Sequence, residues 1–187
     1  MGGYAEVLSG TATAPRLLAR DWGLVDVGFI DRMRASLEED LGAKLFVMSC
    51  LGAEVVAELH GRGIDFTKLA TGLRKFEVEA EKSVSDATKV AEAYLASLLR
   101  SRRPAGRLPS GVGALVQELR SHGDVLIGHV DLVKGLGAIR NAADHRAGPD
   151  TQQPWDISVE AALAGVLMAI VAVRGVHQFR AHSRQLM

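Results

Sequence analysis

The sequence lacks most of the features that would be needed for covalent cross-linking or for crossing a membrane. It contains one cysteine, Cys50, which excludes a disulfide within the chain and a zinc site built on several cysteines. A single cysteine is typical of a reducing cytoplasm. No basic residue precedes a hydrophobic run at the N-terminus, so we expect no signal peptide. The longest uncharged apolar stretch, residues 161–173, is shorter than the roughly 20 residues of a transmembrane helix, which predicts a buried helix in a soluble, cytoplasmic protein.

The chain also has no net charge, since 22 basic residues balance 22 acidic ones. The two halves differ, however: residues 1–99 carry 11 basic and 15 acidic residues, and residues 100–187 carry 11 and 7. Five of the six histidines lie in the second half. If an anionic ligand binds, we expect it to bind the second half of the chain. Small charge differences between the two halves of a protein are nevertheless common.

Several structural signals are missing. No Asn-Gly or Asp-Gly turn joins two alternating apolar runs, which predicts an all-α fold, a helical bundle. The pair Gly135 and Gly137 lacks the third glycine of a dinucleotide-binding loop, and no metal-binding His-Glu-x-x-His is present. His177 and His182 would lie about 140° apart on a helix, so they would not bind one metal together. We therefore expect no cofactor and no metal.

The chain divides into three predicted parts. Residues 1–23 are expected to form an irregular arm, residues 24–105 an N-terminal helical region, and residues 106–187 a C-terminal helical domain. The clearest break is the segment 100–110, where two prolines, a glycine and four arginines interrupt the helical pattern. Periodicity predicts a helical stretch that ends near residue 61. It predicts five further helices at about 67–82, 83–99, 110–121, 123–141 and 156–180.

Some local expectations follow from the same pattern. Gly52 lies on an apolar stripe and is expected to mark a close contact between helices without breaking its own helix. Ser110 is expected to cap the helix that follows it, and Asp156 or Ser158 to cap the last one. The stripe itself comprises Leu41, Leu45, Met48, Val55 and Leu59.

The most informative segment is residues 136–146. Arg140 follows Leu136 by four residues and Val133 by seven, so it extends an apolar stripe that packs on neighbouring helices. A charged group there is costly unless it meets a partner, a cleft or an anion. One structural alternative is that Arg140 simply pairs with Asp144, one helical turn further on.

The residues beyond Arg140 extend this pattern. Asn141 and His145 are four apart and share a helix face, whereas Arg140 and His145 diverge on an ideal helix. A helix that ends near Ala143 would let His145 turn back towards Arg140. One helix end would then present a guanidinium, an amide and an imidazole together. The structural alternative for His145 is that it favours the helix C-terminus through the macrodipole.

This segment resembles the HEPN superfamily, and within it the C-terminal domain of abortive-infection-like proteins. The resemblance rests on Arg140, the polar Asn141 and His145 after four intervening positions, between one apolar helix and a second, long apolar helix. It covers roughly residues 110–180. Two departures are Arg146, where related domains often have glycine, and Ala147, where toxins paired with nucleotidyltransferases have tyrosine.

The resemblance implies a HEPN-like helical bundle and a metal-independent endoribonuclease, acting as a toxin or an abortive-infection, phage-defence effector. Its catalytic residues would be Arg140, Asn141 and His145, with Arg146 binding the RNA backbone. The arginines of 100–107 would either bind the backbone as well or form a solvated loop. The implied partners are RNA, a second copy in a homodimer and an antitoxin or regulatory protein. Two alternatives remain open: a non-catalytic HEPN-like RNA-binding or assembly protein, and an unrelated helical bundle such as a transcriptional regulator.

Overall fold

The computed structural model describes residues 40–145 and 157–185. Within these ranges it contains α-helices and no strand, which confirms the predicted all-α class. The helices are α4 (Asp40–Leu51), α5 (Ala53–Gly61), α6 (Thr67–Lys75), α7 (Ala80–Arg102), α8 (Val112–Ser121), α9 (Ile127–His145) and α10 (Val159–Gln185).

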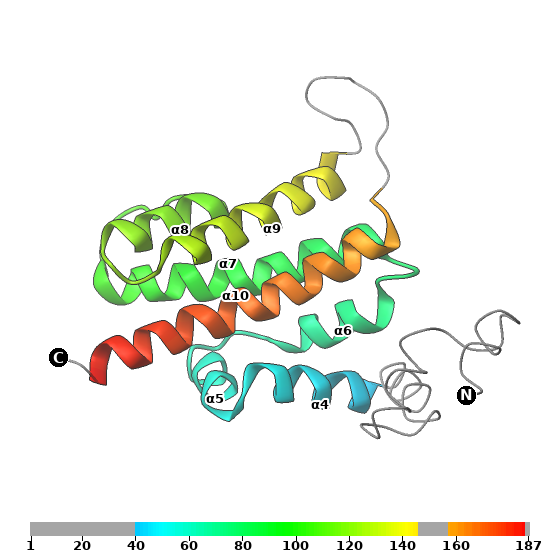
Figure 1. The fold of residues 1–187 in the computed structure, drawn as a ribbon, viewed down its shortest axis with the longest axis horizontal. Helices are drawn as coiled ribbons and strands as arrows, with labels where there is room; N and C mark the ends of the chain where they lie inside the picture. The colour runs from blue at the N-terminus through cyan, green and yellow to red at the C-terminus, as the bar shows by residue number, and fades with distance from the viewer. Residues whose placement is uncertain (1–39, 146–156, 186–187) are drawn as a thin grey trace, which may run out of the picture.

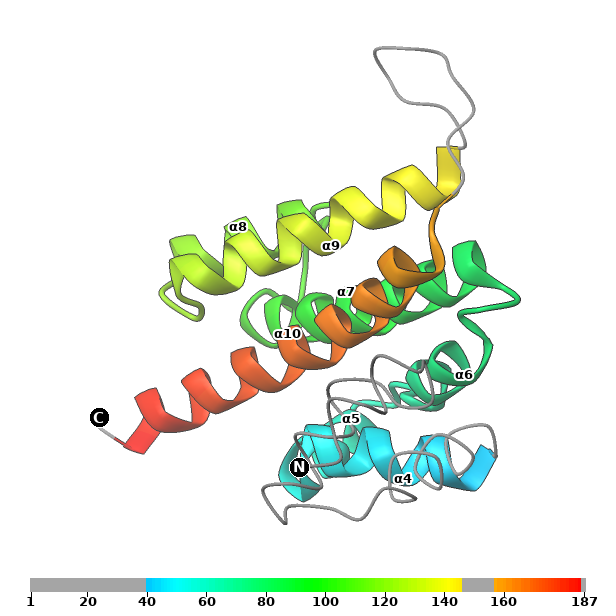
Figure 2. The ribbon, with the colours of Figure 1, turned by 45° about the vertical axis from the view of Figure 1, so that its right-hand side comes forward.

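The described helices form three layers (Figures 1 and 2). The long helices α7 and α10 pack against each other in the middle. The pair α8 and α9 covers one side of this layer, and α4, α5 and α6 cover the other. Because α7 contacts helices on both sides, it buries residues around about half of its circumference, including Val84, Val90, Tyr94 and Leu98.

A single large core joins residues on both sides of position 105. It contains Leu59 and Leu73 from the first part of the chain and Leu115, Leu136 and Val173 from the second. The described part of the N-terminal helical region therefore packs directly on the C-terminal helices. The boundary between the two remains a prediction.

Gly52 breaks the helix, contrary to the sequence-based expectation. Its φ is +86°, a conformation that L side chains rarely adopt, and a Cβ atom placed on it would meet no atom within 4 Å. The glycine is therefore required for the backbone turn between α4 and α5, and no neighbouring helix needs its small size.

The break at Gly52 also explains a wrong prediction about α4. The expected stripe is buried in α5 at Val55 and Leu59, but in α4 its members Leu41, Leu45 and Met48 are exposed. The buried face of α4 consists instead of Ala43, Val47 and Leu51. Because the chain turns at Gly52, the buried face of α4 does not continue into the buried face of α5. One apolar stripe extended through residues 41–59 therefore cannot mark the buried face of both helices.

Helix ends agree with the sequence pattern in part. Ser158 caps α10, since its Oγ accepts a hydrogen bond from the Ala161 backbone N–H at 3.2 Å. Ser110 does not cap α8; the N-cap is Gly111, whose N–H donates to the Glu92 carboxylate. The predicted helix 67–82 ends earlier, at Lys75, and α7 begins at Ala80.

Candidate functional site

Arg140 lies on α9 and belongs to its inward stripe, as its spacing from the buried Val133 and Leu136 predicts. Its Nη1 atom lies 3.6 Å from Oε2 of Glu92 on the neighbouring helix α7. Both side chains are about two-thirds buried, with 28% and 30% of their surface exposed. Arg140 therefore meets a carboxylate from another helix and reaches the surface at the same time.

Glu92 connects Arg140 to a third helix. Its Oε1 atom accepts the Gly111 N–H at 3.2 Å, at the N-terminus of α8. One carboxylate thus satisfies a backbone donor that has no partner within its own helix and also faces the guanidinium. Glu92 could not be predicted from the sequence as the partner of Arg140, because no local pattern connects two residues 48 positions apart.

The helix α9 continues to His145, so it does not end near Ala143 as the converging arrangement requires. At 100° per residue, the Cα atoms of Arg140 and His145 lie about 140° apart around the helix axis. Asn141 is exposed and, by position, shares a face with His145. The side chains of Asp144 and His145, and the whole of Arg146, lie outside the described residues.

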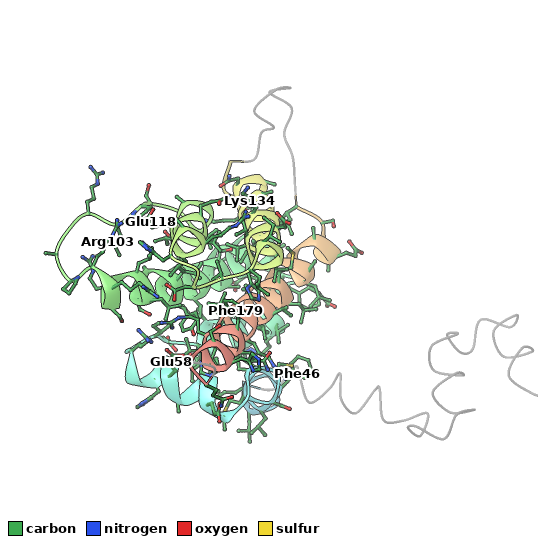
Figure 3. All side chains as sticks on the ribbon, turned by 60° about the vertical axis from the view of Figure 1, so that its left-hand side comes forward. Phe46, Glu58, Arg103, Glu118, Lys134 and Phe179 are labelled. Atoms are coloured by element: carbon green, nitrogen blue, oxygen red, sulfur yellow. The ribbon has the colours of Figure 1, made fainter. Side chains whose placement is uncertain are left out.

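Two arginines of the segment 100–107, Arg102 and Arg103, lie away from Arg140. Arg102 forms an ion pair with Asp124, just before α9 begins. Arg140 comes 13 residues after the start of α9, a distance of about 20 Å along the helix. Arg103 pairs with Glu118 at 2.8 Å, and both are labelled in Figure 3. Arg102 and Arg103 are therefore not close to Arg140, and both are paired with carboxylates.

A second polar cluster, which the sequence analysis did not identify, connects α5, α7 and α10 at Glu58 (labelled in Figure 3). Its Oε2 atom lies 2.6 Å from Nδ1 of His177 and accepts the Tyr94 hydroxyl at 3.0 Å. Its Oε1 atom accepts Nε and Nη2 of Arg62 at 2.9 and 2.7 Å. His182 is exposed, whereas His177 is held by this carboxylate.

The electrostatics of this cluster favour the ionised carboxylate. Burial by itself raises the pKa of Glu58, but the hydrogen bonds from His177, Arg62 and Tyr94 outweigh it, and the pKa lies below its ordinary value. Burial and the neighbouring Glu58 charge raise the pKa of Tyr94, so its hydroxyl stays a donor. The cluster therefore acts as a polar clamp between three helices, with a carboxylate at its centre.

No group of three or more His, Cys, Asp or Glu side chains within the described ranges is arranged to hold a metal ion. By length and composition alone, α10 is apolar enough to cross a membrane; 44% of the relevant window is buried in the bundle. The core helix of a soluble protein passes the same test. The helix buries Val166, Ile170 and Val173 and exposes Leu167 and Val171.

Comparison of the chain with protein-family models, with curated proteins and with solved structures found no match. A functional conclusion therefore has to come from the residues and their arrangement.

Proposed function

We propose that this protein is a metal-independent endoribonuclease of the HEPN type. The observation that carries the proposal is the placement of Arg140, a permanently charged group on the inward stripe of α9 with part of its surface exposed. Asn141 and His145 follow within the last two turns of the same helix. A guanidinium, an amide and an imidazole at one helix end are the groups that RNA cleavage needs.

RNA carries its own nucleophile, the 2′-hydroxyl. His145 accepts or donates a proton near neutral pH, because its reference pKa is about 6.5. In the proposed reaction the 2′-oxygen attacks phosphorus as a base takes its proton, and the bond from phosphorus to the 5′-oxygen breaks as an acid protonates that oxygen. The products are a 2′,3′-cyclic phosphate and a 5′-hydroxyl. Arg140 stabilises the phosphate charge, Asn141 orients the groups and Arg146 binds the backbone.

A homodimer makes this chemistry more effective. One chain offers a single His145, whereas the reaction uses both a base and an acid. The separation of about 140° between Arg140 and His145 on α9 also favours an active site that combines groups from two copies. A twofold axis near Asn141 would place two imidazoles and two guanidinium groups at one phosphate. Such an enzyme would act in the cytoplasm as a toxin or abortive-infection effector, controlled by an antitoxin or regulatory protein.

The ion pair of Arg140 with Glu92 favours one alternative. A guanidinium that already faces a carboxylate is also what a structural salt bridge between α7 and α9 requires. In that case the protein is a non-catalytic HEPN-like RNA-binding or assembly protein, and Arg140 contributes to stability and not to chemistry.

The deciding experiment measures RNA cleavage in the presence of a chelator. Arg140→Ala is expected to reduce the rate by at least about 100-fold, and His145→Ala by about 100- to 10,000-fold. Arg103→Ala, which removes the same charge away from Arg140, is expected to retain activity. The products should carry a 2′,3′-cyclic phosphate, and DNA, which has no 2′-hydroxyl, should not be cut.

Three results would contradict the proposal. The first is a wild-type protein that does not cleave RNA. The second is activity that disappears in the chelator and returns with magnesium. The third is a loss of helical circular dichroism in Arg140→Ala or His145→Ala that parallels the loss of activity, which would make these residues structural.

A further inference from the structure

The outer face of α4 is unusually apolar. Leu41, Leu45 and Met48 are 65%, 56% and 38% exposed. Their spacing of four and three residues places them on one stripe of the helix, about 120° around the axis from the buried stripe of Ala43, Val47 and Leu51. A helix on the surface of a bundle normally presents polar residues on its outer face. A second apolar stripe indicates that something covers α4 from outside.

A groove continues this face onto α5. It has a volume of about 570 Å³ and is lined by Met48 from α4, by Ala53, Val56, Ala57, His60 and Gly61 from α5, and by Phe66. Met48 belongs to both the stripe and the groove, so the two form one continuous apolar surface. The surface is therefore larger than one helix face and offers a recess for large apolar side chains.

The segment directly before α4 has the composition to fill this surface. Residues 24–39 end at the residue preceding Asp40, and they lie outside the described part of the chain. Seven of these sixteen residues are large and apolar: Leu24, Val25, Val27, Phe29, Ile30, Met33 and Leu37. As the helix that its periodicity predicts, the segment would be about 24 Å long, enough to cover the roughly 18 Å of α4.

The charges of the two surfaces also favour residues 24–39 as the segment that covers α4. Residues 24–39 contain four acidic and two basic residues. The exposed Lys44 on α4 and Lys68 on α6 both lie close enough to Asp65 to lower its pKa, after the larger effect of its hydrogen bond with Thr67. Two cations therefore lie on the side of the bundle where α4 and α6 meet, and they match the net negative charge of the segment.

We propose that residues 24–39 fold back over α4 and occupy the groove between α4 and α5, as a cover within the same chain. Because the segment joins α4 directly, its effective concentration at this surface is in the millimolar range, well above that of a second copy in dilute solution. The proposal does not depend on RNA cleavage and can be tested on a protein with no ribonuclease activity.

The first experiment uses disulfide trapping in the full-length chain, with Cys50→Ser to remove the native thiol. Leu45→Cys is combined in turn with Phe29→Cys, Ile30→Cys and Met33→Cys, which together sample one turn of the segment. At least one pair is expected to form a disulfide within one chain, identified by mass spectrometry of linked peptides. In the control, Leu126→Cys replaces Leu45→Cys; Leu126 is similarly exposed at 53% but precedes α9.

A disulfide between two chains would show that a second copy covers α4 and would overturn the proposal. So would trapping no more efficient than in the Leu126→Cys control.

The second experiment measures hydrogen exchange of the backbone amides in residues 24–39. Leu45→Asp is expected to speed their exchange by about tenfold or more, because a buried charge releases the cover. Leu126→Asp should leave the exchange of residues 24–39 unchanged. Equal exchange in both variants would overturn the proposal. Dissociation of an oligomer by Leu45→Asp without faster exchange would overturn it as well, and would assign the surface to another copy.

Discussion

The Arg140 guanidinium of α9 lies 3.6 Å from the Glu92 carboxylate of α7, and that carboxylate also accepts the N–H of Gly111. Three helices thus meet at one charge pair at the border between the core and the solvent. In the proposed enzyme the pair keeps the guanidinium in place before RNA arrives, and phosphate then competes with Glu92 for it.

The first prediction concerns the countercharge of Arg140. Glu92→Gln removes the negative charge that competes with phosphate, so RNA binding is expected to tighten by a few fold, with a cost in stability of about 1 kcal/mol or less. Fluorescence anisotropy with a short RNA at two salt concentrations measures the binding. Glu118→Gln, which releases Arg103 instead, changes the net charge equally and has similar exposure. If RNA binding tightens equally in both variants, the cause is the change in net charge, and the prediction of a specific competition between Glu92 and phosphate is wrong.

The second prediction concerns the proposed shared site. When inactive Arg140→Ala and His145→Ala subunits are mixed and allowed to exchange, the cleavage rate should differ from the average of the two parents. The reason is that a composite site in the mixed dimer contains one intact set of groups from two chains. A fully active monomer at micromolar concentration, measured by light scattering, is incompatible with this prediction.

The third prediction concerns the polar clamp at Glu58. Glu58→Gln is expected to destabilise the protein by about 1–3 kcal/mol at neutral pH, because it weakens the four hydrogen bonds that three residues make to a charged group. The folded-state pKa of Glu58 lies below its ordinary value of 4.5. The stability it contributes is therefore complete above pH 4.5 and is lost as the pH falls below that value.

Urea unfolding of the wild-type protein and the variant between pH 3 and pH 7 measures this difference, which should shrink in acid. Glu54→Gln, one turn away on α5, removes a carboxylate that also lies 3.8 Å from Nε2 of His177 but is 89% exposed. As the control, it should change the stability much less than Glu58→Gln does, because an exposed ion pair contributes little. A difference between the wild-type protein and Glu58→Gln that stays constant down to pH 3 would contradict the prediction.

The fourth prediction compares two glycines on the packed helices α9 and α10. A Cβ atom at Gly165 would lie 3.0 Å from Cγ2 of the buried Val84, whose branched side chain cannot easily move. Gly165→Ala is expected to destabilise the protein by up to about 2 kcal/mol, after the gain in helix propensity is included. A Cβ at Gly135 would meet only the flexible end of Met168, at 2.9 Å, so Gly135→Ala should be neutral or stabilising by up to about 1 kcal/mol. Thermal unfolding separates the two, and the reverse order would contradict the packing argument.

The local features of this protein can be predicted from its sequence. Helical periodicity predicted the all-α class, and the prolines and glycine of 104–109 predicted the break between α7 and α8. Ser158 at the start of α10 and the inward position of Arg140 could also be predicted. All of these depend on residues within one or two helical turns of each other, where the geometry of the helix fixes the relationship.

Features that involve residues far apart in the chain depend on how the helices pack and could not be predicted. Which of the two apolar stripes of α4 is buried depends on the turn at Gly52 and on where α10 lies. Glu92 was not predictable as the partner of Arg140, nor His177 as the partner of Glu58, which is 119 positions away. The sequence contains many carboxylates, and nothing in it distinguishes Glu92 from the others as the partner of Arg140. The packing of α7 between the other helices selects one of them, because burial leaves a charged group only the partners that its neighbours supply.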